Sequence, residues 1–229
     1  MKRTATIILT LAALISFASC SRADISGITS FINSSLTQQS STASPDEQPN
    51  VDLPLRGSSD GEVYENASLG IGIKFDDEWT LYNDVQTAGL NGLSDEKLEE
   101  DYAGVIKKSD LIYDMYAMRS DGSTMNIVFE NMNIIYGSVL NEDAYIDASL
   151  SQAQTTFGQL NWALESSEKV TVTAAEQEFN ALELTANIGS GYLYETRMCK
   201  KIGDHMAVIT IASTDRGVID GMIADFYKV

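Results

Sequence analysis

The chain changes its character near Gly61. From Ser21 to Gly61 it is rich in serine, threonine, glutamine, asparagine and aspartate, and it holds all three prolines of the chain, Pro45, Pro49 and Pro54. Beyond Gly61 the sequence runs in short segments of β type and contains no proline. We therefore expect a tether over residues 20–61 and one well-cored globular domain over residues 62–229.

Alternation of apolar and polar residues indicates the first strands of this domain. Residues 69–75 read Leu-Gly-Ile-Gly-Ile-Lys-Phe, a period of two that gives a strand one buried face. The segments 111–118 and 125–132 flank Asp121-Gly122, a dipeptide that favours the positive dihedral angles of a hairpin turn. The sequence therefore predicts a hairpin at this point.

Helical spacing and capping residues indicate the helices. Ser94 begins a weak helix, and Asn141 is placed to cap a helix that Gly158 ends. Thr214 is placed to cap a closing helix, whose expected apolar stripe consists of Val218, Ile219, Met222, Ile223 and Phe226.

Four further β-type segments lie between these last two helices. They are residues 170–173, 181–187, 192–200 and 206–212, of which the last is the most apolar and is expected at the centre of the sheet. The order of strands, helix, several strands and helix predicts an α+β fold, in which an antiparallel β-sheet is flanked by helices on its faces.

This arrangement resembles the PsbP-like superfamily over residues 61–229. The resemblance rests on the order of the elements: an aromatic first strand, a hairpin, a helix carrying Asp143 and Tyr145, paired strands near Ala181 and Tyr192, and a last helix. The motif of the first strand is Tyr64-x-Asn66-x-x-x-Gly70-x-x-x-x-Phe75-x-x-x-Trp79. The superfamily includes the extrinsic photosystem protein PsbP, a Ran-binding nuclear import factor and many small lipoproteins. The resemblance implies an α/β/α sandwich and no catalytic residues. The sequence departs from it where Asp76-Asp77-Glu78, rather than a proline turn, precedes Trp79.

The first twenty residues have the layout of an export signal. Lys2 and Arg3 precede an apolar run over residues 7–17, and the small Ala18 and Ser19 follow. The run is shorter than the roughly 20 apolar residues of a membrane-spanning helix. Residues 17–20, Phe-Ala-Ser-Cys, resemble the bacterial lipobox, with Phe where Leu is commoner. We expect a signal peptide over residues 1–19 and lipid attachment at Cys20; the alternative is an ordinary secretory signal with a chance cysteine.

A lipid on Cys20 would fix the location of the protein. Two acyl chains hold a protein on a bilayer almost permanently, because each buried methylene contributes about 0.8 kcal/mol. We therefore expect an extracytoplasmic protein that is lipid-anchored to the cell membrane. Its tether of some 40 residues would place the domain about 35 Å from the bilayer. The only other cysteine is Cys199, so we expect no structural disulfide.

The charge balance excludes some partners. Removal of residues 1–19 takes two of the 15 basic residues and none of the 33 acidic ones, which leaves a formal excess of 20 negative charges. Such a surface repels nucleic acid and anionic lipid headgroups. It fits either a basic or cationic partner or simply a well-solvated exterior.

Few residues in the sequence suggest a catalytic or metal-binding role. His205 is the only histidine, so a Ser-His-Asp triad would have to include it and a two-histidine metal site is excluded. Cys199 in a β segment is typical of a small buried hydrophobe rather than a reactive thiol. Acidic clusters occur, but none has the spacing of a twelve-residue calcium loop; they are residues 76–78, 99–101 and 142–143. We therefore assign no catalytic or metal-binding residue and no cofactor.

The sequence favours a membrane-anchored binding or accessory module without catalytic activity. We expect a monomer that contacts the membrane through the lipid on Cys20, has an envelope protein as a possible partner, and binds no nucleic acid. One alternative is an envelope hydrolase that uses His205 and carboxylates. Another is an assembly factor for an envelope complex, which would expose a large apolar patch.

Overall fold

The computed structural model describes residue 54 and residues 56–229 of the chain. The predictions about Cys20, the signal peptide and most of the tether concern residues outside this part. Within it the chain forms two antiparallel sheets and five helices, which confirms the α+β class. The sequence predicted one sheet, whereas the structure has two.

The smaller sheet joins the beginning and the end of the described chain. Its strand order is β1-β2-β3-β11. The strands are β1 (Ser58–Asp60), β2 (Val63–Asn66), β3 (Ile71–Lys74) and β11 (Phe226–Lys228). The predicted alternation over residues 69–75 is confirmed, because Leu69, Ile71, Ile73 and Phe75 are all buried.

The larger sheet has seven strands in the order β4-β5-β6-β10-β9-β8-β7. The predicted hairpin is confirmed as β5 and β6, and β10 is the central strand as expected. The bounds are β4 (Trp79–Leu81), β5 (Leu111–Arg119), β6 (Thr124–Asn131), β7 (Ala163–Ala174), β8 (Gln177–Asn187), β9 (Tyr192–Ile202) and β10 (His205–Ser213).

Side-chain caps begin the helices. The caps predicted at Ser94 and Asn141 are confirmed, since their side chains accept hydrogen bonds from the backbone N–H groups of Lys97 and Ala144. The helices are α3 (Asp84–Leu90), α4 (Asp95–Lys108), α5 (Met132–Tyr136), α6 (Glu142–Gln159) and α7 (Arg216–Ala224).

The prediction for the closing helix was wrong at both ends. Asp215, not Thr214, caps α7, because the Asp215 carboxylate accepts the N–H of Gly217 at 2.8 Å. Phe226 lies in β11 and not on the helix, because α7 ends at Ala224 and the chain then pairs with β3.

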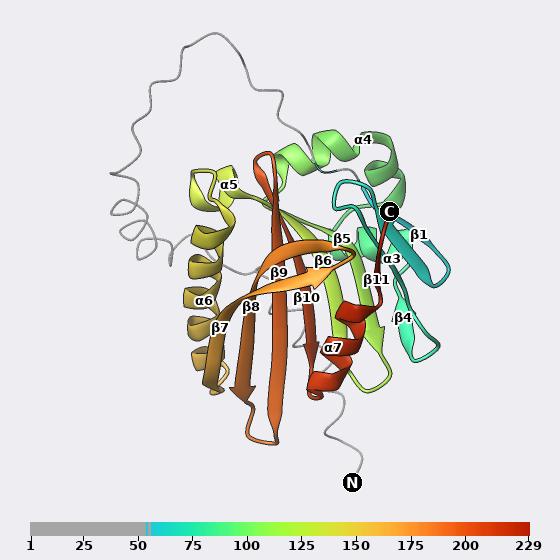
Figure 1. Cartoon of the computed structure of the whole chain (residues 1–229). Coiled ribbons are helices and arrows are strands. Elements are labelled where there is room, and N and C mark those ends of the chain that lie inside the picture. The colour runs from blue at the N-terminus through green and yellow to red at the C-terminus, as the bar shows by residue number, and fades with distance from the viewer. Residues whose placement is uncertain (1–53, 55) are drawn as a thin grey trace.

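Helices cover both faces of the larger sheet. α6 packs against β7, β8 and β9 on one face, and α7 packs against β9 and β10 on the other (Figure 1). The strands therefore bury apolar side chains on both sides and produce two cores. One core, with Phe129 and Ile209, lies between the two sheets and α7, and the other, with Val128 and Phe157, lies under α6.

Asp114 joins the two sheets. It sits at a β-bulge in β5, where the register against β6 shifts between Tyr113 and Met115. Its buried carboxylate accepts hydrogen bonds from four groups: the Tyr64 hydroxyl, the Asn66 amide at 2.9 Å, the Gly57 N–H at 3.0 and 3.1 Å, and the Tyr102 hydroxyl at 3.3 Å. Burial raises the pKa of Asp114, and the hydrogen bonds oppose that rise by favouring the ionised form.

The folded region reaches further toward the N-terminus than the expected start at residue 62. β1 lies within the range expected for the tether and pairs with β2. The guanidinium of Arg56 lies 3.0 Å from the carboxylate of Asp95 on α4. Together with the hydrogen bond from Gly57 to Asp114, these contacts attach residues 56–60 to the domain.

Candidate functional site

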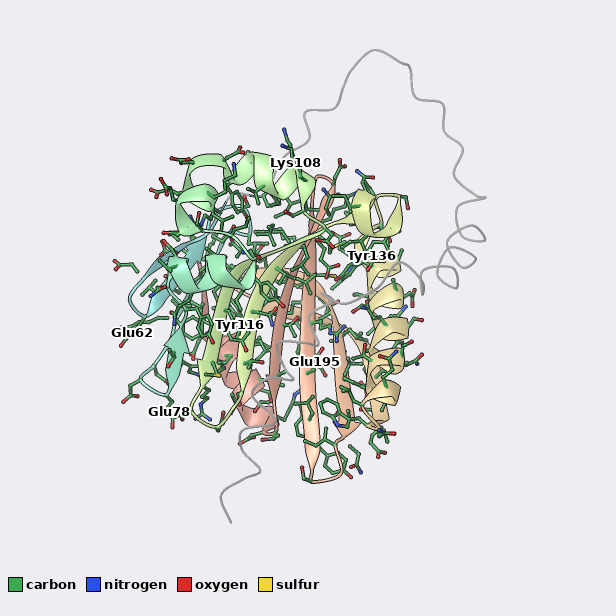
Figure 2. The ribbon with its side chains drawn as sticks, turned by 180° about the vertical axis from the view of Figure 1, so that it is seen from behind. Glu62, Glu78, Lys108, Tyr116, Tyr136 and Glu195 are labelled. Atoms are coloured by element: carbon green, nitrogen blue, oxygen red, sulfur yellow. The ribbon has the colours of Figure 1, made fainter. Side chains whose placement is uncertain are left out.

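A cluster of buried polar side chains lies between α6 and the larger sheet. It consists of Glu130 from β6, Glu195 and Arg197 from β9, and Tyr145 and Ser149 from α6, all of them buried. We call these five residues the α6 cluster. Figure 2 shows the larger sheet from the side opposite α7, with Glu195 labelled.

Arg197 connects two members of the α6 cluster. Its Nε donates a hydrogen bond to Glu195, and its Nη1 donates one to the Ser149 hydroxyl at 3.0 Å. Residues two positions apart on a strand share a face, which places this carboxylate and guanidinium together. Their side chains are 1% and 5% exposed. Each charge therefore depends on the other, because a single buried charge without a partner is strongly unfavourable.

Glu130 is a carboxyl of the cluster whose acidity is altered by burial. Its side chain is 0% exposed. Burial raises the pKa of Glu130 to about 7, while the hydroxyl of Tyr145 and the charge of Arg197 oppose the rise. Burial also raises the pKa of Tyr145 well above its usual value, so this hydroxyl stays protonated. Carboxyls that change protonation near neutral pH gather at functional sites.

The chemistry that the α6 cluster offers is proton binding at Glu130. The group can gain or lose a proton near neutral pH, and the fixed charge pair of Glu195 and Arg197 lies on the same face of the sheet. All five side chains are enclosed in the described fold. We therefore regard the cluster as a proton-binding site rather than a surface for substrate.

His205 lies on the other face of the sheet. In the register of β10 and β6, His205 is opposite Asn131 and Met206 is opposite Glu130, so the side chains of His205 and Glu130 point to opposite faces. The His205 Nε2 lies 3.2 Å from the carbonyl oxygen of Ile106, to which it can only donate. Burial lowers the pKa of His205, and the carbonyl and the charge of Asp204 oppose that effect. The structure does not bring His205 together with the carboxyls of the α6 cluster.

Cys199 is buried and carries a free thiol. Its Sγ lies 3.3 Å from the carbonyl oxygen of Asn180. Burial, assisted by the negative charges of Glu142 and Asp143, raises the pKa of Cys199 to about 12. The thiol therefore stays protonated at neutral pH, as expected of a small buried side chain and unlike a nucleophile.

Two of the acidic clusters shape turns and a helix. In residues 76–78, Asp76 accepts the N–H of Glu78 at 2.9 Å, and Glu78 forms an ion pair with Arg119. In residues 99–101, Asp101 accepts a hydrogen bond from Lys97 at 3.1 Å, which lowers the pKa of Asp101. These carboxylates have partners within the domain.

The third acidic cluster fastens the start of α6 to the sheet. Glu142 accepts the N–H of Lys201 at 3.1 Å, and Asp143 accepts the side-chain amide of Asn180 at 3.3 Å. Among residues 54 and 56–229, no three or more His, Cys, Asp or Glu side chains gather in a way that could hold a metal ion. None of the helices in this part of the chain is long and apolar enough to cross a membrane.

The α6 cluster was not predicted from the sequence, although a signal for it exists. Glu130 ends the apolar segment Met-Asn-Ile-Val-Phe-Glu, and Glu195 and Arg197 interrupt β9 at positions two apart. A charged residue on the buried face of a strand needs a partner or a shifted pKa. The sequence could not show that α6 would enclose these positions.

A scan against protein-family models found no family that matches this chain, and a search of curated proteins found no matching relative.

Proposed function

We propose that the chain is a membrane-anchored extracytoplasmic lipoprotein, whose folded domain acts as a binding or accessory module without catalytic activity. The observation that carries this proposal is the enclosure of the two side chains best suited to covalent or acid–base catalysis. The Cys199 thiol is buried with its pKa raised to about 12, and the only histidine is buried against the carbonyl of Ile106.

We further propose that the domain is of the PsbP-like type. The support is its layering, because α6 and α7 lie on opposite faces of the larger antiparallel sheet. This is the α/β/α order that the resemblance implies. The smaller sheet of β1, β2, β3 and β11 then adds to this layering at the side where the described chain begins and ends.

The geometry gives little support to the two alternatives. A hydrolase would need His205 in a cleft with at least two carboxylates. The charge of Asp204 acts on His205, but Glu130 and Glu195 lie on the other face of the sheet. An assembly factor would need a large apolar patch. The large apolar side chains that are exposed in the described region lie on separate elements: Val85 and Leu90, Ile134 and Val139, Tyr192, and Tyr227 and Val229.

We expect Cys20→Ala to abolish lipid attachment and to leave the signal peptide uncut by the lipoprotein peptidase. The reason is that the thiol of Cys20 is the only site for the acyl group in the lipobox-like segment. Metabolic labelling with a fatty acid, followed by mass measurement of the purified protein, would check this. Cys199→Ala is the matched control and should keep the label. A labelled Cys20→Ala protein would contradict the proposal.

We expect the anchored protein to have a protein partner with a basic surface. The formal excess of 20 negative charges on the mature chain assists the encounter, and this attraction weakens as salt shortens the Debye length from about 8 Å at physiological ionic strength. Cross-linking in cells, followed by purification from detergent-solubilised membranes, should recover the partner with a yield that falls as salt rises.

A charge variant provides the control for this experiment. Glu96, Glu99 and Glu100 are exposed on α4, and replacing all three with glutamine should lower the yield without unfolding the domain. The proposal fails if cross-linking recovers no protein while the purified chain binds one small molecule with an affinity that does not depend on salt.

A further inference from the structure

Glu130 stands where β6 gives way to the helices that cover the sheet. The next residue, Asn131, caps α5 by accepting the N–H of Ile134 at 3.3 Å. α5 leads through residues 137–141 into α6, and Tyr145 in the second turn of α6 lies against the Glu130 carboxyl. The Glu130 carboxyl is therefore enclosed by α5 and α6, the helices that follow it in the chain.

The ionisable groups around Glu130 give its charge little compensation. They are Tyr145 on α6 with Tyr136 of α5 beside it, Arg197 and Cys199 on β9, and Asp110 ahead of β5. Arg197, the cation among them, is bound to Glu195 and Ser149. Asp110 repels a second negative charge.

Hydrogen bonding does not make up for the weak compensation that the neighbouring charges give to the Glu130 carboxylate. No hydrogen bond of normal geometry reaches either oxygen of Glu130 from the described residues, although the Tyr145 hydroxyl lies close enough to favour the ionised form. A neutral carboxylic acid tolerates such a place, whereas a carboxylate with so little hydrogen bonding must gain water.

Water can reach Glu130 most easily by displacement of α5 and the start of α6. β6 itself is paired along its length with β10, and with β5 apart from the bulge at Asp114. α5, by contrast, has five residues and exposes Ile134 to 49%. Elements with few buried contacts are those that open first.

We propose that Glu130 is a proton-operated latch. When its carboxyl is neutral, α5 and the first turns of α6 close on the sheet. When the carboxyl is ionised, these helices open. Opening exposes Met132 and Leu140, which are buried in the closed state. The latch is a property of the domain and does not depend on the proposed function.

The direction of the effect follows from the pKa of Glu130. Its value in the closed state is about 7, above the ordinary 4.5, so the closed state binds the proton more tightly than the open state does. The latch is therefore most stable below about pH 4.5, weakens as the pH rises to about 7, and levels off at higher pH. The equilibrium constant for opening should increase by up to roughly 300-fold across this range.

Hydrogen exchange of the full mature chain, measured by mass spectrometry between pH 5 and pH 8, would test the latch. After correction for the chemical exchange rate, protection over residues 132–150 should fall by roughly 70-fold from pH 5 to pH 8. In Glu130→Gln, which keeps the shape and removes the charge, protection over these residues should not change with pH. Glu168→Gln, at an exposed position on β7, is the matched control and should behave like the unmodified chain.

A carboxyl-carbon NMR titration of Glu130 in the unmodified chain provides a second measurement that needs no variant. A midpoint near pH 7 that coincides with the loss of protection supports the latch. A midpoint near 4.5 would overturn it, as would a pH dependence of protection that persists in Glu130→Gln.

Discussion

Arg197→Met should lower the free energy of unfolding by about 3–5 kcal/mol at neutral pH. The replacement keeps much of the apolar length of the side chain but removes the guanidinium. Glu195, with 1% exposure, would then be a buried carboxylate without its cation, and the Ser149 hydroxyl would lose its donor. Denaturant unfolding followed by fluorescence would measure the loss.

A double variant separates the loss of the pair from damage to packing. Arg197→Met combined with Glu195→Leu removes both charges, so most of the stability should return, because apolar residues of similar volume commonly replace a buried ion pair without net cost. Ser149→Ala should cost only about 1 kcal/mol. If the double variant were as unstable as Arg197→Met, the effect would come from packing and not from the unpaired charge.

Asp114→Ala should lower the free energy of unfolding by roughly 3–5 kcal/mol, because several buried donors lose their acceptor at once. Tyr64 and Asn66 are 0% and 1% exposed, so water cannot easily replace the carboxylate. The substitution also frees the N–H of Gly57, which holds the start of the described chain on β5. Thermal unfolding would report the loss.

The matched control for this prediction is Tyr102→Phe. It removes one of the hydrogen bonds to Asp114, the long one at 3.3 Å, and keeps the ring, so it should cost no more than about 1 kcal/mol. Protease cleavage near residues 56–60 should increase in Asp114→Ala and not in Tyr102→Phe. Equal instability of the two variants would show that Asp114 does not act as a shared acceptor.

Local signals in the sequence predicted most elements correctly. Asn141 and Ser94 cap the expected helices, and Asp121-Gly122 lies in the expected hairpin turn. These features depend on hydrogen bonds and dihedral angles within a few residues, so the sequence carries them directly. The apolar segment that became β10 was also placed correctly at the centre of its sheet.

The elements that were missed are short or depend on distant partners. α3 has seven residues and little apolar periodicity, although Asn83 and Gln86 form a capping box that the sequence displays. β1 and β11 have three residues each and form because β2 and β3 offer pairing edges. A strand of three residues is too short to show a recognisable alternation of apolar and polar residues in the sequence.

The candidate site could be predicted less well than the fold. His205 and Cys199 attracted attention by residue type, and the structure encloses both. Glu130, Glu195 and Arg197 were passed over because charged residues in strands usually face water. Their roles depend on which face of each strand α6 covers.

The sequence by itself determined the hairpin of β5 and β6, the apolar segment that became β10 and the starts of α4 and α6, because periodicity and capping act over short distances. Tertiary structure alone decided that the strands divide into two sheets and that β11 returns to pair with β3. It also decided the acidity of Glu130, because the pKa of a carboxyl depends on how completely α6 and the neighbouring strands remove it from water. Desolvation is the sum of many long-range contacts, which no local pattern in the chain records.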